Sequence, residues 1–154
     1  MTGFRQAVEA RDVAAIEAAL APDVVFRSPV AFRPYPGKAI TAAILRGVLR
    51  VFEDFRYVRE IGGGRDHALV FQARIGEVEV EGCDFLRLDE NGLVTELTVM
   101  VRPLSAAHAL SETMAAQFPQ IQREAAEGAG GAGGGGGGRG AGGGRGGVSA
   151  QGSE

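Results

Sequence analysis

Residues 78–103, VEVEGCDFLRLDENGLVTELTVMVRP, begin with an alternation of apolar and polar side chains. In a β-strand, successive side chains point to opposite faces of the sheet. One face of residues 78–88 therefore carries Asp84 among apolar residues, and the other face carries charged residues with Cys83 and Phe85. Asn91-Gly92 is typical of a tight hairpin. We therefore predict that residues 78–88 pair antiparallel with a second strand over residues 93–102, which Pro103 ends.

Asp84 is the unusual residue of this segment, because it is the single carboxylate on the apolar face. Burying an ionised carboxylate costs free energy unless the group is paired or hydrogen-bonded, and an unpaired buried carboxyl has a raised pKa. We therefore predict that Asp84 lines a pocket and gives or takes a proton there. The alternative is a structural carboxylate that an arginine or backbone donors satisfy.

The rest of the chain predicts helix, strand and helix, followed by a four-stranded antiparallel meander. The predicted elements are helical turns within residues 4–20, a strand over 23–30, a helix over 38–52, strands over 53–61, 66–75, 78–88 and 93–102, and an amphipathic helix around 110–121 that Pro119 disturbs. We expect an α+β fold, in which a curved, mostly antiparallel sheet forms a cone and the N-terminal helices enclose a pocket.

The glycines divide the chain into two parts. Residues 128–154 contain 16 of its 25 glycines and almost no apolar side chains, which predicts a disordered tail after a single domain over residues 1–127. The tail holds one Arg-Gly-Gly step, at Arg145, and no aromatic residue for base stacking. With a net charge of −3, the chain is not expected to bind nucleic acid.

Composition also bears on cofactors and location. Cys83 is the only cysteine, which excludes an intramolecular disulfide and fits a reducing cytoplasm. Two histidines and one cysteine are too few for a familiar zinc pattern. The first residues include no apolar run typical of a signal peptide or a membrane span. We therefore expect a cytoplasmic protein with no metal, no other cofactor and no membrane partner.

Two segments carry a family resemblance: EARDVAAIEAALAPDVVFRSPVAFRPYPGKAITAAI, residues 9–44, and EGCDFLRLDENGLVTELTVMVRP, residues 81–103. Their order and spacing resemble the nuclear transport factor 2-like superfamily. They are most similar to its SnoaL-like branch, which contains polyketide cyclases and ketosteroid isomerases. The resemblance covers roughly residues 4–117 and implies the cone fold and a homodimer, for which an exposed Phe85 would fit a subunit contact.

The resemblance also suggests roles for three residues. Ketosteroid isomerases use a carboxylate base together with an oxyanion hole made of a tyrosine and a protonated aspartic acid. By motif, the protonated aspartic acid falls on Asp84, the base on Ser28 and the tyrosine on Phe4. Because serine is a poor base and phenylalanine donates no hydrogen bond, steroid isomerase chemistry is not expected.

The polyketide cyclases of this branch are similar in keeping an aspartate near the position of Asp84 as an acid and base. The resemblance therefore favours an acid–base isomerase or cyclase that acts on a hydrophobic carbonyl substrate. The alternative is a noncatalytic module for ligand binding or dimerisation.

Five further residues are candidates for binding a small hydrophobic molecule. Phe26 and Ser28 share a face of their strand, where the Ser28 hydroxyl contacts either a ligand or nearby backbone. Arg102 lies with Met100 by alternation, on a face expected to be shared with Asp84, where it either pairs with Asp84 or binds an anionic ligand. The alternative is a solvated arginine at the end of the strand. Tyr57, predicted to share a face with Phe55 and Ile61, either supplies a hydroxyl to the cavity or packs in the core. His67 and His108 are not expected to be catalytic.

Overall fold

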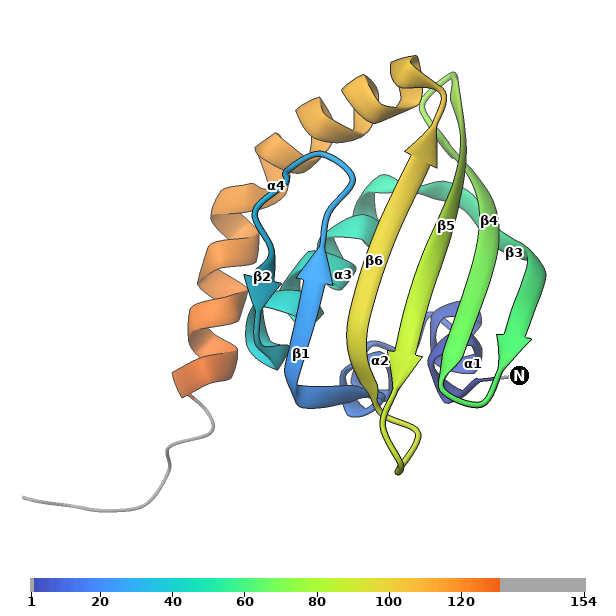
Figure 1. The fold of residues 1–154 in the computed structure, drawn as a ribbon. Coiled ribbons are helices and arrows are strands. Elements are labelled where there is room, and N and C mark those ends of the chain that lie inside the picture. Colours follow the sequence, from blue (N-terminus) through green and yellow to red (C-terminus); the bar gives the residue numbers. More distant parts are fainter. Residues whose placement is uncertain (1, 131–154) are drawn as a thin grey trace, which may run out of the picture.

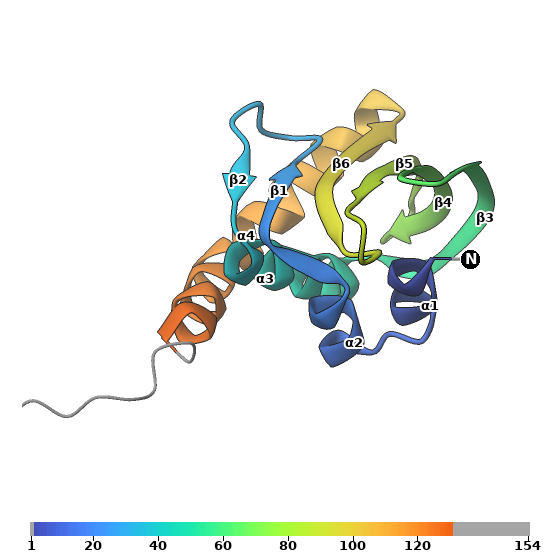
Figure 2. The same cartoon turned by 60° about the horizontal axis from the view of Figure 1, so that its bottom comes forward.

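The computed structural model describes residues 2–130, which form an α+β fold. The elements follow one another as α1 (Gly3–Glu9), α2 (Val13–Ala18), β1 (Leu20–Arg27), β2 (Tyr35–Pro36), α3 (Lys38–Val51), β3 (Glu53–Gly63), β4 (Asp66–Ile75), β5 (Val78–Leu88), β6 (Val94–Arg102) and α4 (Leu104–Gly130). The predicted fold class is confirmed: a curved, mostly antiparallel sheet is packed against helices (Figures 1 and 2).

The strands form one six-stranded sheet in the order β2-β1-β6-β5-β4-β3. Strands β3 to β6 make the predicted antiparallel meander, and β1 joins it by pairing parallel to β6. The short β2 lies between the predicted strand over residues 23–30 and the predicted helix over residues 38–52, and it pairs antiparallel with β1. Figure 2 shows the sheet curving strongly from β6 to β3, which gives it a concave side.

The helices cover this concave side (Figure 2). Helix α3 turns an apolar stripe toward the sheet, including Ala43 and Ile44, and its other flank packs against α4. Gly47 lets the two helices approach closely, because a Cβ atom there would come within 2.8 Å of the Ile121 side chain. The enclosing layer therefore includes the C-terminal helix as well as the predicted N-terminal helices.

Helix α4 is longer than the sequence predicts. It starts at Leu104 and continues through Pro119 to Gly130, and Figure 1 shows it changing direction part-way along its length. Proline in a helix interior removes one backbone hydrogen bond and bends the helix. The buried side chains of Leu110 and Ile121 hold segments on both sides of Pro119 against the domain. The predicted disordered tail begins within this helix, and its residues 131–154 lie outside the described part of the chain.

Strand register decides which side chains reach the interior. In β5 the predicted alternation is confirmed, because Val80, Asp84 and Leu86 are buried and Phe85 is exposed. In β3 a register shift between Tyr57 and Arg59 interrupts the alternation. The prediction that Ile61 shares the face of Tyr57 is therefore wrong: Ile61 is exposed. Between residues 2 and 130, no helix combines the length and the apolar character needed to cross a membrane.

Candidate functional site

A cavity of about 400 Å³ lies between the concave side of the sheet and the helices. This volume is within the range of small-molecule pockets. Its wall is mainly apolar, and every helix contributes to it. The lining residues are Phe4, Val8, Ile16, Phe26, Ser28, Pro29, Val30, Tyr35, Ile44, Leu45, Val48, Leu49, Phe52, Phe55, Tyr57, Phe71, Asp84, Val99, Leu110, Ser111, Met114, Ala115 and Phe118.

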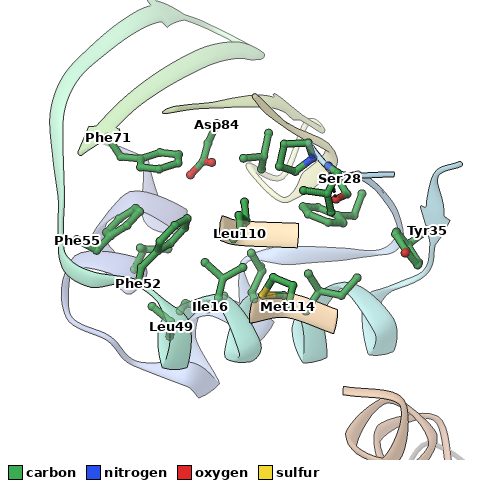
Figure 3. Close-up of a pocket in the computed structure, with 18 of the residues that line it drawn as sticks. Ile16, Ser28, Tyr35, Leu49, Phe52, Phe55, Phe71, Asp84, Leu110 and Met114 are labelled. Carbon is green, nitrogen blue, oxygen red and sulfur yellow. Dashed lines mark hydrogen bonds between the residues drawn. The ribbon is translucent and has the colours of Figure 1, made fainter. Parts of the chain in front are cut away.

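Aromatic rings form the wall beside Asp84 (Figure 3). The ring of Phe55 lies 5.0 Å from the rings of both Tyr57 and Phe71, measured between centroids. Phe71 lies over Gly82 of the neighbouring strand, and a Cβ atom at Gly82 would overlap its ring. Glycine at this position therefore lets Phe71 lie close to β5, two residues along the strand from Asp84.

Asp84 lies on β5, which is an inner strand of the sheet, paired on both sides. Its register partners are Leu69 of β4 and Val99 of β6, so its side chain leaves the concave face between two apolar residues. The residue is only 8% exposed. The hydroxyl of Tyr57 donates a hydrogen bond of 2.7 Å to its Oδ2 atom. Figure 3 shows the carboxyl group pointing into the cavity, with Phe71 to one side and Leu110 beyond it.

The surroundings of Asp84 favour its neutral form. Burial raises the pKa of Asp84 to about 7, although the hydrogen bond from Tyr57 lowers it. Burial and the neighbouring charge of Asp84 also raise the pKa of Tyr57 well above its ordinary value, so Tyr57 stays a hydrogen-bond donor. Both the carboxyl and the carboxylate form of Asp84 are therefore populated near neutral pH, at the wall of a mainly apolar cavity.

Residues 1–97 match the model of the SnoaL-like domain. The chain belongs to the SnoaL-like family. A comparison with curated proteins gave no match.

Solved structures agree with this SnoaL-like assignment. A steroid delta-isomerase from Pseudomonas aeruginosa is 40% identical and superimposes with a TM-score of 0.73, covering 78% of this chain and 89% of that one. An uncharacterised bacterial protein with a cystatin-like fold from Silicibacter pomeroyi is 34% identical, with a TM-score of 0.71 and coverage of 79% and 91%. A SnoaL-like protein of unknown function from Burkholderia thailandensis, 17% identical with a TM-score of 0.54 and coverage of 66% and 90%, shares the fold.

Three of the predicted binding residues line the cavity of this SnoaL-like domain: Phe26, Ser28 and Tyr57. The Ser28 hydroxyl accepts a hydrogen bond of 3.1 Å from the backbone N–H of Val30, which is the local bond that the sequence left open. Tyr57 both packs in the aromatic wall and donates to Asp84, so its two predicted alternatives occur together.

Arg102 and Met100 are not where the sequence predicted them. Because Asp84 pairs with Val99, the residues on its face in β6 are the odd-numbered ones, and Met100 is 59% exposed on the convex face. Arg102 pairs with Glu81 and donates a hydrogen bond of 3.1 Å to that carboxylate. The prediction that Arg102 shares the face of Asp84 is therefore wrong, because the strand register was assumed one residue out of step.

Two features of the site went beyond the sequence prediction. The wall formed by α4, with Leu110, Met114 and Phe118, was visible only as an apolar helix stripe of unknown partner. Phe4, discussed only as the counterpart of a tyrosine, lines the cavity. Among the described residues, no group of three or more histidine, cysteine, aspartate or glutamate side chains is arranged to hold a metal ion.

Proposed function

We propose that this SnoaL-like protein binds a small, mainly apolar molecule with a carbonyl group and that Asp84 transfers a proton to or from it. The observation that carries the proposal is the buried carboxyl group of Asp84, which faces a mainly apolar cavity and accepts a hydrogen bond from Tyr57. Burial raises its pKa to about 7. General acid–base catalysis is most effective when the pKa of the catalytic group lies near the working pH. Asp84 meets that condition at neutral pH.

The two forms of Asp84 support two steps of one reaction. As a carboxylate it accepts a proton from the carbon next to the carbonyl group, and as a carboxylic acid it returns that proton to another carbon or to oxygen. The Tyr57 hydroxyl, 2.7 Å from Oδ2, stabilises the carboxylate form that exists before the first step and after the second. Isomerisation of an unsaturated ketone and aldol-type cyclisation both need such proton transfers.

The relatives support this reaction class without fixing the substrate. The Pseudomonas aeruginosa protein that is 40% identical is described as a steroid delta-isomerase. In this chain, Ser28 and Phe4 occupy the positions that the resemblance gives to the base and the tyrosine of ketosteroid isomerases. A reaction here would therefore use Asp84, which is the one carboxyl group among the described residues that line the cavity, with Tyr57 of β3 donating a hydrogen bond to it.

Ser28 and Phe4 favour a second candidate function, which is noncatalytic ligand binding. The Ser28 hydroxyl already accepts a bond from backbone, and Phe4 adds only apolar surface to the cavity. In this case Asp84 and Tyr57 orient a ligand oxygen without turnover.

Asp84→Asn distinguishes the two candidates. We would incubate the protein with β,γ-unsaturated ketones of graded size and follow the ultraviolet absorbance of the conjugated product and the uptake of solvent deuterium. In the variant, the rate of proton transfer should fall by about 10²-fold or more, whereas ligand binding should be kept. Asparagine has nearly the shape of aspartate, but its amide does not accept or release a proton in this pH range. Asp23→Asn, at an exposed position of β1, is the matched control.

If Asp84→Asn catalyses exchange as fast as the native protein, Asp84 does not transfer the proton. If the native protein binds these ketones but neither isomerises them nor incorporates deuterium, the noncatalytic function is correct. Mass spectrometry of molecules extracted from the purified protein would then identify the ligand.

A further inference from the structure

A cation lies over the tyrosine that contacts Asp84. The guanidinium carbon of Arg5 is 5.8 Å from the centroid of the Tyr57 ring, which is within the range of a cation–π interaction. Arg5 extends from α1, whereas Tyr57 belongs to β3. The Arg5 side chain is 18% exposed.

Two carboxylates hold the guanidinium of Arg5 in this position. Its Nε donates a hydrogen bond of 2.8 Å to Glu9 on the same helix, and its Nη1 donates one of 3.0 Å to Glu60 of β3. A planar guanidinium with two such bonds has a fixed orientation. Arg5 is therefore constrained both along its helix and toward the strand that carries Tyr57.

The register shift in β3 is what turns Glu60 toward Arg5. With strict alternation from Tyr57, residues 59 and 61 would share the concave face and Glu60 would point away. The shift after Tyr57 instead makes Glu60 the partner of Leu69, which is itself the partner of Asp84. Glu60 and Asp84 thus leave the same face of the sheet. Such irregularities commonly redirect a side chain beside a functional site.

Arg5, Tyr57 and Asp84 form a chain of two contacts, in which the hydrogen bond from Tyr57 to Asp84 strengthens the contact between Arg5 and the Tyr57 ring. When Tyr57 donates its hydrogen bond to an ionised Asp84, electron density on the phenol oxygen and ring increases. An electron-rich ring attracts a cation more strongly. The Arg5 contact is therefore most favourable when Asp84 carries its negative charge.

We propose that Arg5 is a positioning residue of this site, which holds the ring of Tyr57 and favours negative charge on the Tyr57–Asp84 pair. The inference rests on the proposed role of Asp84 in proton transfer, because it says what keeps the carboxylate form accessible in an apolar cavity. Arg5 itself does not line that cavity, so it acts through Tyr57.

Other charged groups near Arg5 modify this effect. The charge of Glu9 raises the pKa of Tyr57, whereas the charge of Arg5 lowers it. On β4, the Nδ1 atom of His67 lies 3.9 Å from the Oε1 atom of Glu60, whereas Arg5 donates to the Oε2 atom of the same carboxylate. The test therefore changes Arg5 and leaves Glu9, Glu60 and His67 in place.

The experiment is an NMR titration of the Asp84 side-chain carboxyl carbon in the full chain. Arg5→Met removes the cation, and it should raise the midpoint of the Asp84 titration by about half a pH unit. Arg5→Lys keeps the charge and should leave the midpoint closer to that of the native protein. In a Tyr57→Phe background, Arg5→Met should have less than half of its original effect, because the hydroxyl that connects the two groups is gone.

Arg123→Met removes one positive charge from an exposed position on α4 and controls for net charge. If Arg5→Met does not fold, Arg5→Gln gives the same test, since its amide keeps a polar group near both glutamates. An unchanged Asp84 midpoint in the folded variant, or an equal shift with and without the Tyr57 hydroxyl, overturns the inference. The titration needs no substrate, so its result is independent of whether Asp84→Asn loses proton transfer.

Discussion

At the scale of single residues, the position of Asp84 links function to stability. A carboxyl whose pKa is raised by burial binds its proton more tightly in the folded protein than in the unfolded chain. Stability from this group is therefore greatest below the unfolded pKa, near 4, and it decreases as the pH rises toward the folded pKa of about 7. The contribution of Asp84 to the free energy of unfolding is therefore smallest at the pH values where its carboxylate is available as a base.

Asp84→Asn should therefore be more stable than the native protein at pH 8. Asparagine keeps an acceptor for the Tyr57 hydroxyl but never ionises, so the free energy of unfolding should exceed that of the native protein by up to about 4 kcal/mol at pH 8. The difference should shrink as the pH falls toward 4. Urea unfolding at several pH values, followed by circular dichroism, measures both quantities.

Asp23→Asn serves as the control for this measurement, because residue 23 is exposed. It should show no comparable gain at pH 8. A constant stability difference between Asp84→Asn and the native protein across this pH range would mean that Asp84 ionises in the folded state as it does in the unfolded chain.

At the scale of elements, the sequence predicted what periodicity alone determines. The alternation in residues 78–88 placed Asp84 on the buried face of β5, and the Asn91-Gly92 hairpin placed β6 beside it. Periodicity does not determine register between strands, and for this reason Arg102 was assigned to the wrong face. It also does not reveal an extra residue in β3, which moves Ile61 outward and Glu60 inward.

The partners of helices are equally hidden from the sequence. The apolar stripe of α4 was visible, but its role as a wall of the cavity depends on packing against α3. Pro119 suggested a disturbance, whereas packing on both sides of it keeps the helix continuous. Tertiary contacts therefore outweighed local preference in α4.

Gly82→Ala tests how β4 and β5 together shape the cavity. A methyl group at residue 82 would overlap the Phe71 ring and come within 2.8 Å of the Met100 carbonyl oxygen, so either the ring or the strand must move. We expect destabilisation by about 1–3 kcal/mol, the usual cost of overpacking a core. Thermal and urea unfolding measure this cost, and weaker binding of an apolar fluorescent probe would report displacement of Phe71 into the cavity.

Gly63→Ala is the matched control, since residue 63 also belongs to a strand and a Cβ atom there meets nothing within 4 Å. It should be neutral or slightly stabilising. Equal stability of the two alanine variants would show that Phe71 does not depend on the space above Gly82.

At the scale of the whole molecule, the two faces of the sheet differ in character. The concave face encloses the cavity, whereas the convex face carries the row Ile61, Ala68, Phe85 and Thr98 across neighbouring strands. The next row, Asp66, Arg87 and Glu96, is charged, and Arg87 contacts both acidic residues. An apolar centre beside a charged margin is the arrangement found in many protein interfaces.

The predicted homodimer stays a prediction, and Phe85→Arg tests it. Phe85 is 43% exposed in the apolar row, so a second copy packed on this face would bury its ring. An arginine there would place an unpaired charge at the centre of the contact and should weaken the dimer by about tenfold or more, as measured by sedimentation velocity over a range of concentrations. Val13→Arg, at a similarly exposed residue of α2, should leave association unchanged.

Because Phe85 points away from the cavity, the Asp84 titration should be the same in the Phe85→Arg monomer as in the native protein. A native protein that stays monomeric at high concentration, or a Phe85→Arg variant that dimerises as strongly as the native chain, would exclude this face as the subunit contact.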